Sequence, residues 1–212
     1  MPINGKPLLS IWLNRLVDAN YGPFIINGHY MSDKIEEFTL NSKHRGRIKY
    51  VYEKKILGTA GTLIKNLDFL DNGGMLAHAD NFCLADFKEF FLVHQKRPES
   101  CLMTMMTFSN TNPESCGIVE LDSNNIVKKF YEKDPDAKGT IANGAIYLLS
   151  EEMINIIRNN YNKCNDFSTE ILPEFVNKIF TYHTNELLID IGTKENYLRA
   201  NEFDKIYNNE NN

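Results

Sequence analysis

The chain has 212 residues, of which 42% are hydrophobic and 24% charged. This composition supports a buried core and argues against wholesale disorder. The formal net charge of -5 argues against a nucleic-acid-binding protein, which usually carries a basic excess. The four cysteines have neither CxxC nor metal-ligand spacing, which is typical of free thiols in a reducing compartment. Without an apolar run of membrane-spanning length or a signal-peptide pattern, we expect a cytoplasmic protein with no membrane partner.

The first half of the chain alternates helical and strand patterns after a turn marked by Pro2, Gly5 and Pro7. Hydrophobic periodicity and end signals predict, in order, a helix at 8–19, a strand at 24–27, a helix from Ser32, a strand at 48–53, a helix at 59–70, a strand at 75–80 and a helix at 86–94.

The second half carries strands in succession. They are predicted at 101–108, 116–122, 128–133 and 143–150, followed by helices at 151–161 and 169–180, a short apolar strand ending at Gly192 and a helix at 194–206. Residues 207–212 are expected to be a disordered tail. The pattern predicts one α/β domain over 1–212, with a mixed, mainly parallel sheet flanked by helices.

Three segments could carry chemistry at strand ends, where open α/β sheets bind ligands. In LGTAGTL (57–63), two glycines precede a helix, so its backbone could approach a ligand closely, although an ordinary strand-to-helix turn explains it equally well. Asp80 ends the strand pattern HAD, and Asp190 lies within LLIDIG. Carboxylates so placed could bind Mg²⁺ together, while a cap or turn role is the plainer reading for either one alone.

Two further segments are ambiguous by themselves. Lys133, after Glu132, could hold a sugar phosphate as a point charge, or it could belong to a solvated hairpin end. Asn143, before a buried strand, could bond sugar hydroxyls or form the turn that enters the strand.

In their order, these segments resemble the sugar-phosphate nucleotidyltransferases, also called nucleoside-diphosphate-sugar pyrophosphorylases. The resemblance runs nearly end to end, through PINGKPLL (2–9), FIINGHY (24–30), E-x-x-x-LGTAGTL (53–63), HAD (78–80), CGIVELD (116–122), EK (132–133), NGAIYLL (143–149), DFSTEILP (166–173) and IDIGTKENYLRAN (189–201). Within the family, the sequence is most similar to guanylyltransferases acting on mannose- or heptose-type 1-phosphates. The resemblance implies a Rossmann-like fold of the nucleotide-diphospho-sugar transferase type.

The resemblance also implies the reaction: a nucleoside monophosphate, GMP in this subfamily, passes from a nucleoside triphosphate to a sugar 1-phosphate with release of pyrophosphate. The product would feed surface polysaccharide synthesis. Residue roles carried over by motif are Mg²⁺ binding by Asp80 and Asp190, a nucleotide pocket of Glu53, Gly58 and Thr59, phosphate binding by Lys133, and sugar contacts by Gly117, Glu132 and Asn143. Cys116 stands where the family usually has tyrosine. A homo-oligomer is left open.

The family has a first strand and a glycine-rich loop, GGxGTRLxPLT, ahead of the segment that resembles 2–9, and this sequence does not contain them. In the family that strand lies between the strands expected at 24–27 and 75–79, and the loop wraps the triphosphate. We favour an active nucleotidyltransferase in which Met1 is an internal methionine of a longer chain. The alternatives are a non-catalytic sugar-phosphate- or nucleotide-binding or regulatory module, and a glycosyltransferase of related fold.

Overall fold

The computed structural model describes residues 1–110 and 116–210, the last five of these as backbone alone. Its strands are β1 (Pro2–Ile3), β2 (Lys6–Pro7), β3 (Phe24–Gly28), β4 (Ile48–Tyr52), β5 (Gly74–Ala77), β6 (Asn81–Cys83), β7 (Met103–Ser109), β8 (Ile118–Leu121), β9 (Val127–Tyr131), β10 (Ile141–Leu149), β11 (Ile179–His183) and β12 (Leu188–Asp190). Its α-helices are α1 (Leu8–Asp18), α2 (Ser32–Asn41), α3 (Gly58–Lys65), α4 (Phe87–Gln95), α5 (Glu151–Asn160) and α6 (Lys194–Glu210).

Most of these elements lie where the periodicity predicts them, but the expected helix at 169–180 is wrong. Residues 167–171 form a π-helical turn and 172–175 a 3-10 turn. Asn177 has a φ of 74°, and Ile179–His183 then form β11, parallel to β7. Of the expected tail, 207–210 continue α6, whereas 211–212 lie outside the described residues.

The main sheet is mixed, as expected, with strand order β11-β7-β10-β8-β9 and with β5 also paired to β10. The expectation of a mainly parallel sheet is wrong in detail. β10 runs antiparallel to β5, β7 and β8, and β8 runs antiparallel to β9, so only the β11–β7 pairing of this sheet is parallel among the described residues. β8, β9 and β10 follow one another with no helix between them, and antiparallel pairs such as β8–β9 and β8–β10 need no crossover connection.

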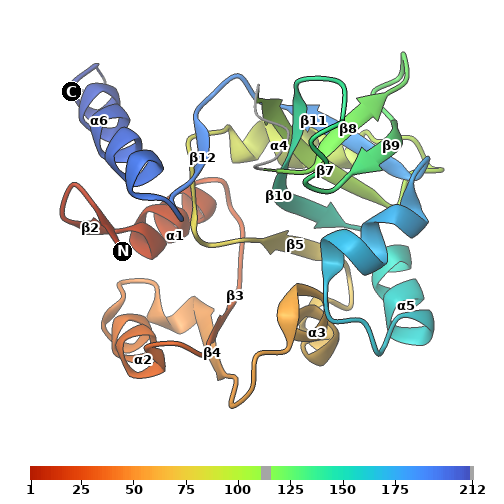
Figure 1. Cartoon of the computed structure of the whole chain (residues 1–212). Helices are drawn as coiled ribbons and strands as arrows, with labels where there is room; N and C mark the ends of the chain where they lie inside the picture. Colours follow the sequence, from red (N-terminus) through yellow and green to blue (C-terminus); the bar gives the residue numbers. More distant parts are fainter. Residues whose placement is uncertain (111–115, 211–212) are drawn as a thin grey trace.

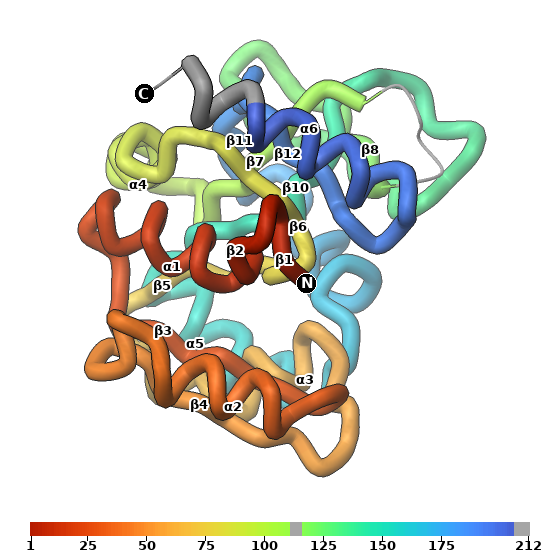
Figure 2. Tube along the Cα trace, turned by 90° about the vertical axis from the view of Figure 1, so that its left-hand side faces the viewer, coloured from red at the N-terminus to blue at the C-terminus, as the bar shows by residue number. Residues whose placement is uncertain are grey.

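A second, parallel pair consists of β3 and β4. Among the described strands, β3 pairs only with β4 and β5 only with β10, so no hydrogen-bonded strand joins the pair to the main sheet. Figures 1 and 2 show β3, β4 and α2 together on one side of the molecule, with the chain's N-terminus beside α1 and the β1–β2 hairpin.

Helices cover both faces of the main sheet. Alternate β10 residues point to opposite faces: Tyr147 and Leu149 pack with α3, α5 and the 167–175 turns, whereas Ile146 and Leu148 pack with α1, α4 and α6. The strands of this sheet are therefore buried on two sides, which explains their nearly continuous apolar runs. Within the part of the chain that the structure describes, no helix combines the length and apolarity needed to cross a membrane.

Candidate active site

The site is built around a bulge in β10. One edge of β10 pairs with β7, and the other pairs with β8 at Ala142 and with β5 from Ile146 onward. The pairing of β10 with β7 shifts register between Asn143 and Tyr147, and within this stretch Ala145 adopts a φ of 53°. Bulges of this kind bend a strand and redirect side chains. The sheet therefore forks at 143–145, where the end of β5 and the start of β8 meet.

The Asp80 loop is attached to this fork. The His78 amide donates to the Ala145 carbonyl at 3.2 Å, and the Asn81 side-chain amide donates to the Gly144 carbonyl at 3.1 Å. The Asn81 carbonyl in turn accepts from the Trp12 indole at 2.7 Å. The loop that carries Asp80 is thus held on both sides, by the bulge and by helix α1.

Asp190 lies next to Asp80, although 110 residues separate them in the sequence. β12 pairs with β6 so that Asp190 faces Asn81, and the Ile191 amide donates to the Asp80 carbonyl at 3.1 Å. Both aspartates are exposed. One oxygen of Asp190 already accepts from the Gly192 amide at 2.6 Å, which fixes the orientation of its carboxylate.

Two neighbouring aspartates are a donor set of the kind that Mg²⁺ uses. Mg²⁺ prefers oxygen ligands and is often held by one or two carboxylates together with phosphate oxygens. Across residues 1–110 and 116–210 there is no group of three His, Cys, Asp or Glu side chains that could hold a metal. The donor set therefore suits an ion whose remaining ligands come from phosphates and water.

The residues expected on the sugar side come together beside the bulge. The backbone amide of Asn143 donates to the Gly117 carbonyl at 2.8 Å. A Cβ placed on Gly117 would lie 2.9 Å from Glu132 Oε2 and closer still to the Phe130 ring, so only glycine leaves this space open. Gly117, Glu132 and Asn143 thus border one region on three different strands or their ends.

The electrostatics of this region depend on three charged groups. Burial raises the pKa of the Glu132 carboxyl, Lys133 acts in the opposite direction, and Asp166 adds to the rise. Lys133 follows directly, is exposed and has a φ of 49°. An anionic substrate at this place would find the Lys133 ammonium accessible.

The residues expected on the nucleotide side have internal partners. Glu53 is only 3% exposed, and its carboxylate accepts from the Thr62 hydroxyl at 2.6 Å. The Thr59 hydroxyl accepts from the Phe167 amide at 2.8 Å. A Cβ on Gly58 would lie 2.2 Å from the Asn165 carbonyl oxygen. The glycine at position 58 is therefore required by packing against 165–167, a role that the motif alone did not indicate.

Sequence reasoning missed two residues that organise this site. Asn81 connects the Asp80 loop to the bulge through its hydrogen bond to the Gly144 carbonyl. The Tyr147 hydroxyl accepts a hydrogen bond from the Asn143 side-chain amide at 2.7 Å. The signal for Tyr147 was available, because a tyrosine inside an apolar strand must find a partner for its hydroxyl. No such signal marked Asn81, whose partner carbonyl depends on the bulge.

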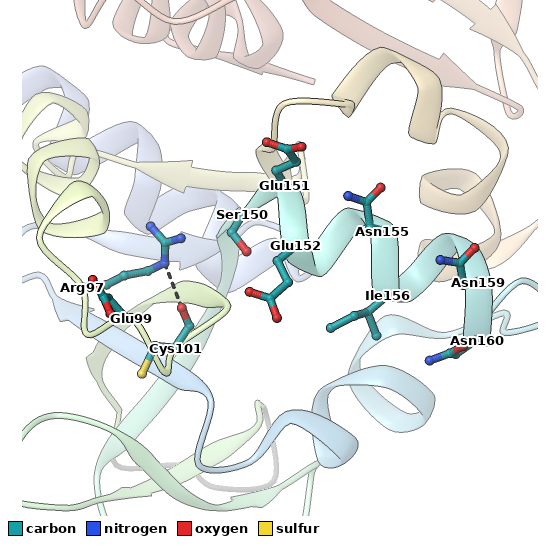
Figure 3. A pocket seen from close by; sticks show the side chains of 10 residues that line it. All are labelled: Arg97, Glu99, Cys101, Ser150, Glu151, Glu152, Asn155, Ile156, Asn159 and Asn160. Carbon is teal, nitrogen blue, oxygen red and sulfur yellow. Dashed lines mark hydrogen bonds between the residues drawn. The ribbon is translucent and has the colours of Figure 1, made fainter.

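A hollow of about 530 Å³ lies elsewhere. Its polar lining comes from helix α5 and from the loop that follows α4, where Arg97 donates to the Cys101 carbonyl (Figure 3). Ser150 borders it, directly after β10, whereas Asn143 lies near the start of that strand. The hollow therefore lies at the opposite end of β10 from Asn143. It is separate from the forked site.

The fold is that of the nucleotide-diphospho-sugar transferases. The structure of HddC from Yersinia pseudotuberculosis complexed with GMP-PN superposes with a TM-score of 0.79 at 23% identity, covering 95% of this chain and 87% of that one. UDP-glucose pyrophosphorylase complexed with UDP-glucose gives a TM-score of 0.80 at 17% identity, with coverages of 98% and 89%.

The chain belongs to the nucleotidyl transferase family, whose profile matches residues 1–206. The D-glycero-α-D-manno-heptose 1-phosphate guanylyltransferase of Campylobacter jejuni is 29% identical over 92% of this chain and 85% of its own length. The glucose-1-phosphate adenylyltransferase of Mycoplasma mobile is 26% identical over 82% of this chain. The chain spans about half the length of several relatives, including 50% of the Mycoplasma protein and 53% of a mannose-1-phosphate guanylyltransferase subunit of Drosophila melanogaster.

Proposed function

We propose that this protein transfers GMP from GTP to a mannose- or heptose-type sugar 1-phosphate, releasing pyrophosphate, and so supplies a nucleotide sugar for surface polysaccharide. The observation that carries the proposal is the meeting of the paired carboxylates Asp80 and Asp190 with Gly117, Glu132 and Asn143 around one bulge. The guanylyl choice is supported by the names of the Campylobacter and Drosophila relatives. Since nucleoside triphosphates do not cross membranes unaided, a cytoplasmic location fits this reaction.

In this proposal the chain acts by binding and orienting two anions. Glu132 and Asn143 hold sugar hydroxyls, and Lys133 holds the sugar phosphate, one of whose oxygens forms the new bond to the α-phosphorus as pyrophosphate leaves. The turn at Gly58 and Thr59 borders the nucleotide. Mg²⁺ held by Asp80 and Asp190 would supply neutralisation of phosphate charge.

The test is a substrate panel. Purified protein with Mg²⁺ is given GTP, ATP, UTP or dTTP with mannose 1-phosphate, D-glycero-α-D-manno-heptose 1-phosphate or glucose 1-phosphate, and nucleotide sugars are identified by mass spectrometry. We expect a guanosine diphosphate sugar. Asp190→Asn, which keeps the acceptor for the Gly192 amide, should lower turnover by on the order of 100-fold or more with an unchanged Tm, whereas Asp18→Asn at the end of α1 should be neutral.

Different failures have different meanings. Preference for another triphosphate would overturn only the guanylyl assignment. Binding of a sugar 1-phosphate without transfer from any triphosphate would favour the non-catalytic binding module. Full turnover of Asp190→Asn would contradict the two-carboxylate metal site.

A further inference from the structure

Tyr147 carries a hydroxyl into the core of the protein. Its side chain is 0% exposed, and its ring packs against that of Phe167 with centroids 5.0 Å apart. Burial raises the pKa of the phenol, so the hydroxyl keeps its proton. Phenylalanine would fill the same space without a polar group to satisfy. The packing therefore explains the ring of Tyr147 but not its hydroxyl.

The hydroxyl reaches Asn143 because of the bulge. In a regular strand, residues four apart lie about 13 Å from each other along the strand. The register shift between Asn143 and Tyr147 and the positive φ of Ala145 shorten this separation. As a result, Asn143 Nδ2 donates to the Tyr147 hydroxyl at 2.7 Å.

Both ends of the Asn143 side-chain amide make hydrogen bonds within the protein. Its Oδ1 accepts from the Ala145 amide at 3.0 Å, while Nδ2 is bound to Tyr147. Because an asparagine amide has two N–H donors and two acceptor lone pairs, one donor and one acceptor remain. Asn143 is 8% exposed, beside Gly117 and Glu132, so this remaining pair has one fixed orientation at the sugar side.

Tyr147 also connects this asparagine to the nucleotide side. The Tyr147 ring packs against the Phe167 ring, and the Phe167 backbone amide donates to the Thr59 hydroxyl. The contact with Phe167 therefore fixes the Tyr147 ring, and through it the position of the hydroxyl that binds Asn143.

We propose that the Tyr147 hydroxyl is a positioning group for sugar recognition, which locks the Asn143 amide in the orientation that binds the sugar 1-phosphate. The inference rests on the proposed function. It does not place Tyr147 in contact with substrate, because its side chain is fully buried. It predicts that removing one buried oxygen weakens sugar binding through Asn143 alone.

The test is calorimetric titration of mannose 1-phosphate or D-glycero-α-D-manno-heptose 1-phosphate, whichever the wild type binds more tightly, into wild-type protein, Tyr147→Phe, Asn143→Ala and the double variant. Loss of one orienting hydrogen bond is worth about 1 kcal/mol, so Tyr147→Phe should raise the Kd about 5-fold. In the Asn143→Ala background the same change should have no further effect. GTP binding should be unchanged by Tyr147→Phe.

Tyr182→Phe is the matched control, because its hydroxyl donates to Glu89 at 3.1 Å on the face that α4 covers. It should leave the sugar 1-phosphate Kd unchanged. An unchanged Kd in Tyr147→Phe, or equal effects with and without Asn143, would overturn the positioning role. A wild-type protein that binds neither sugar 1-phosphate would instead contradict the proposed function itself.

Discussion

Individual side chains of the site are already engaged inside the protein. Thr59 accepts from Phe167, the Glu53 carboxylate binds Thr62, and Asn143 uses both ends of its amide. Motifs predicted these positions but not their partners, because each partner comes from a segment remote in sequence or from an irregular backbone. Fewer hydrogen-bonding atoms of these side chains are therefore available to a ligand than the residue types alone suggest.

His94 lies outside the candidate site, and the protonation of its imidazole affects the stability of the folded protein. It is 9% exposed and shares a 2.8 Å hydrogen bond with the Thr104 hydroxyl. Burial, aided by Arg97, lowers the pKa of His94 to about 4. The folded protein therefore keeps this imidazole neutral at pH values where the unfolded chain binds a proton.

We expect the free energy of unfolding to fall as the pH drops from about 6.5 towards 4, by up to about 3 kcal/mol from this group. Urea titrations across this range should show a shallower slope for His94→Gln than for the wild type. Identical slopes in the two proteins would mean that His94 titrates normally in the fold.

At the scale of elements, the bulge in β10 brings together the segments that form the candidate site. Ala145 lies at its centre with a φ of 53°, a conformation that costs a residue with a Cβ about 1 kcal/mol or more. The glycine of the bulge occupies the preceding position, where a Cβ would lie 3.0 Å from the Met106 carbonyl oxygen. Glycine is therefore needed at position 144 because of close packing, and the backbone conformation with positive φ is adopted by the alanine at position 145 instead.

Ala145→Gly should raise the free energy of unfolding by up to about 1 kcal/mol, because glycine adopts positive φ without strain. Ala142→Gly, in the same strand at a residue without positive φ, should lower it by about 1 kcal/mol. Thermal or urea unfolding measures both. If Ala145→Gly were as destabilising as Ala142→Gly, the bulge would not be strained at Ala145.

The elements also show where sequence reasoning fails. Apolar residues at 171, 172, 175, 176 and 179 repeat at a helical spacing, yet β11 begins at Ile179. Pairing with β7, some 75 residues away, decides the structure there, and a local pattern contains no information about that partner. The strongly periodic helices α1 and α5, in contrast, appear where predicted.

At the scale of the whole molecule, the order of motifs predicted which distant residues would meet. Asp80 and Asp190 became neighbours through the β6–β12 pairing, although no local pattern indicated β6. The β3–β4 pair stands apart from the main sheet among the described strands. The residues of the candidate site are therefore brought together by the main sheet and by the loops at positions 143–145, where the sheet forks.

The most direct test of this site is a crystal structure of the protein with GDP-mannose and Mg²⁺. We expect the mannose to contact Glu132 and Asn143, the diphosphate to lie between Lys133 and the two aspartates, and the guanosine to border Gly58 and Thr59. A nucleotide sugar bound instead in the hollow beside Ser150 and α5, or elsewhere away from the β10 bulge, would contradict the assignment of the active site.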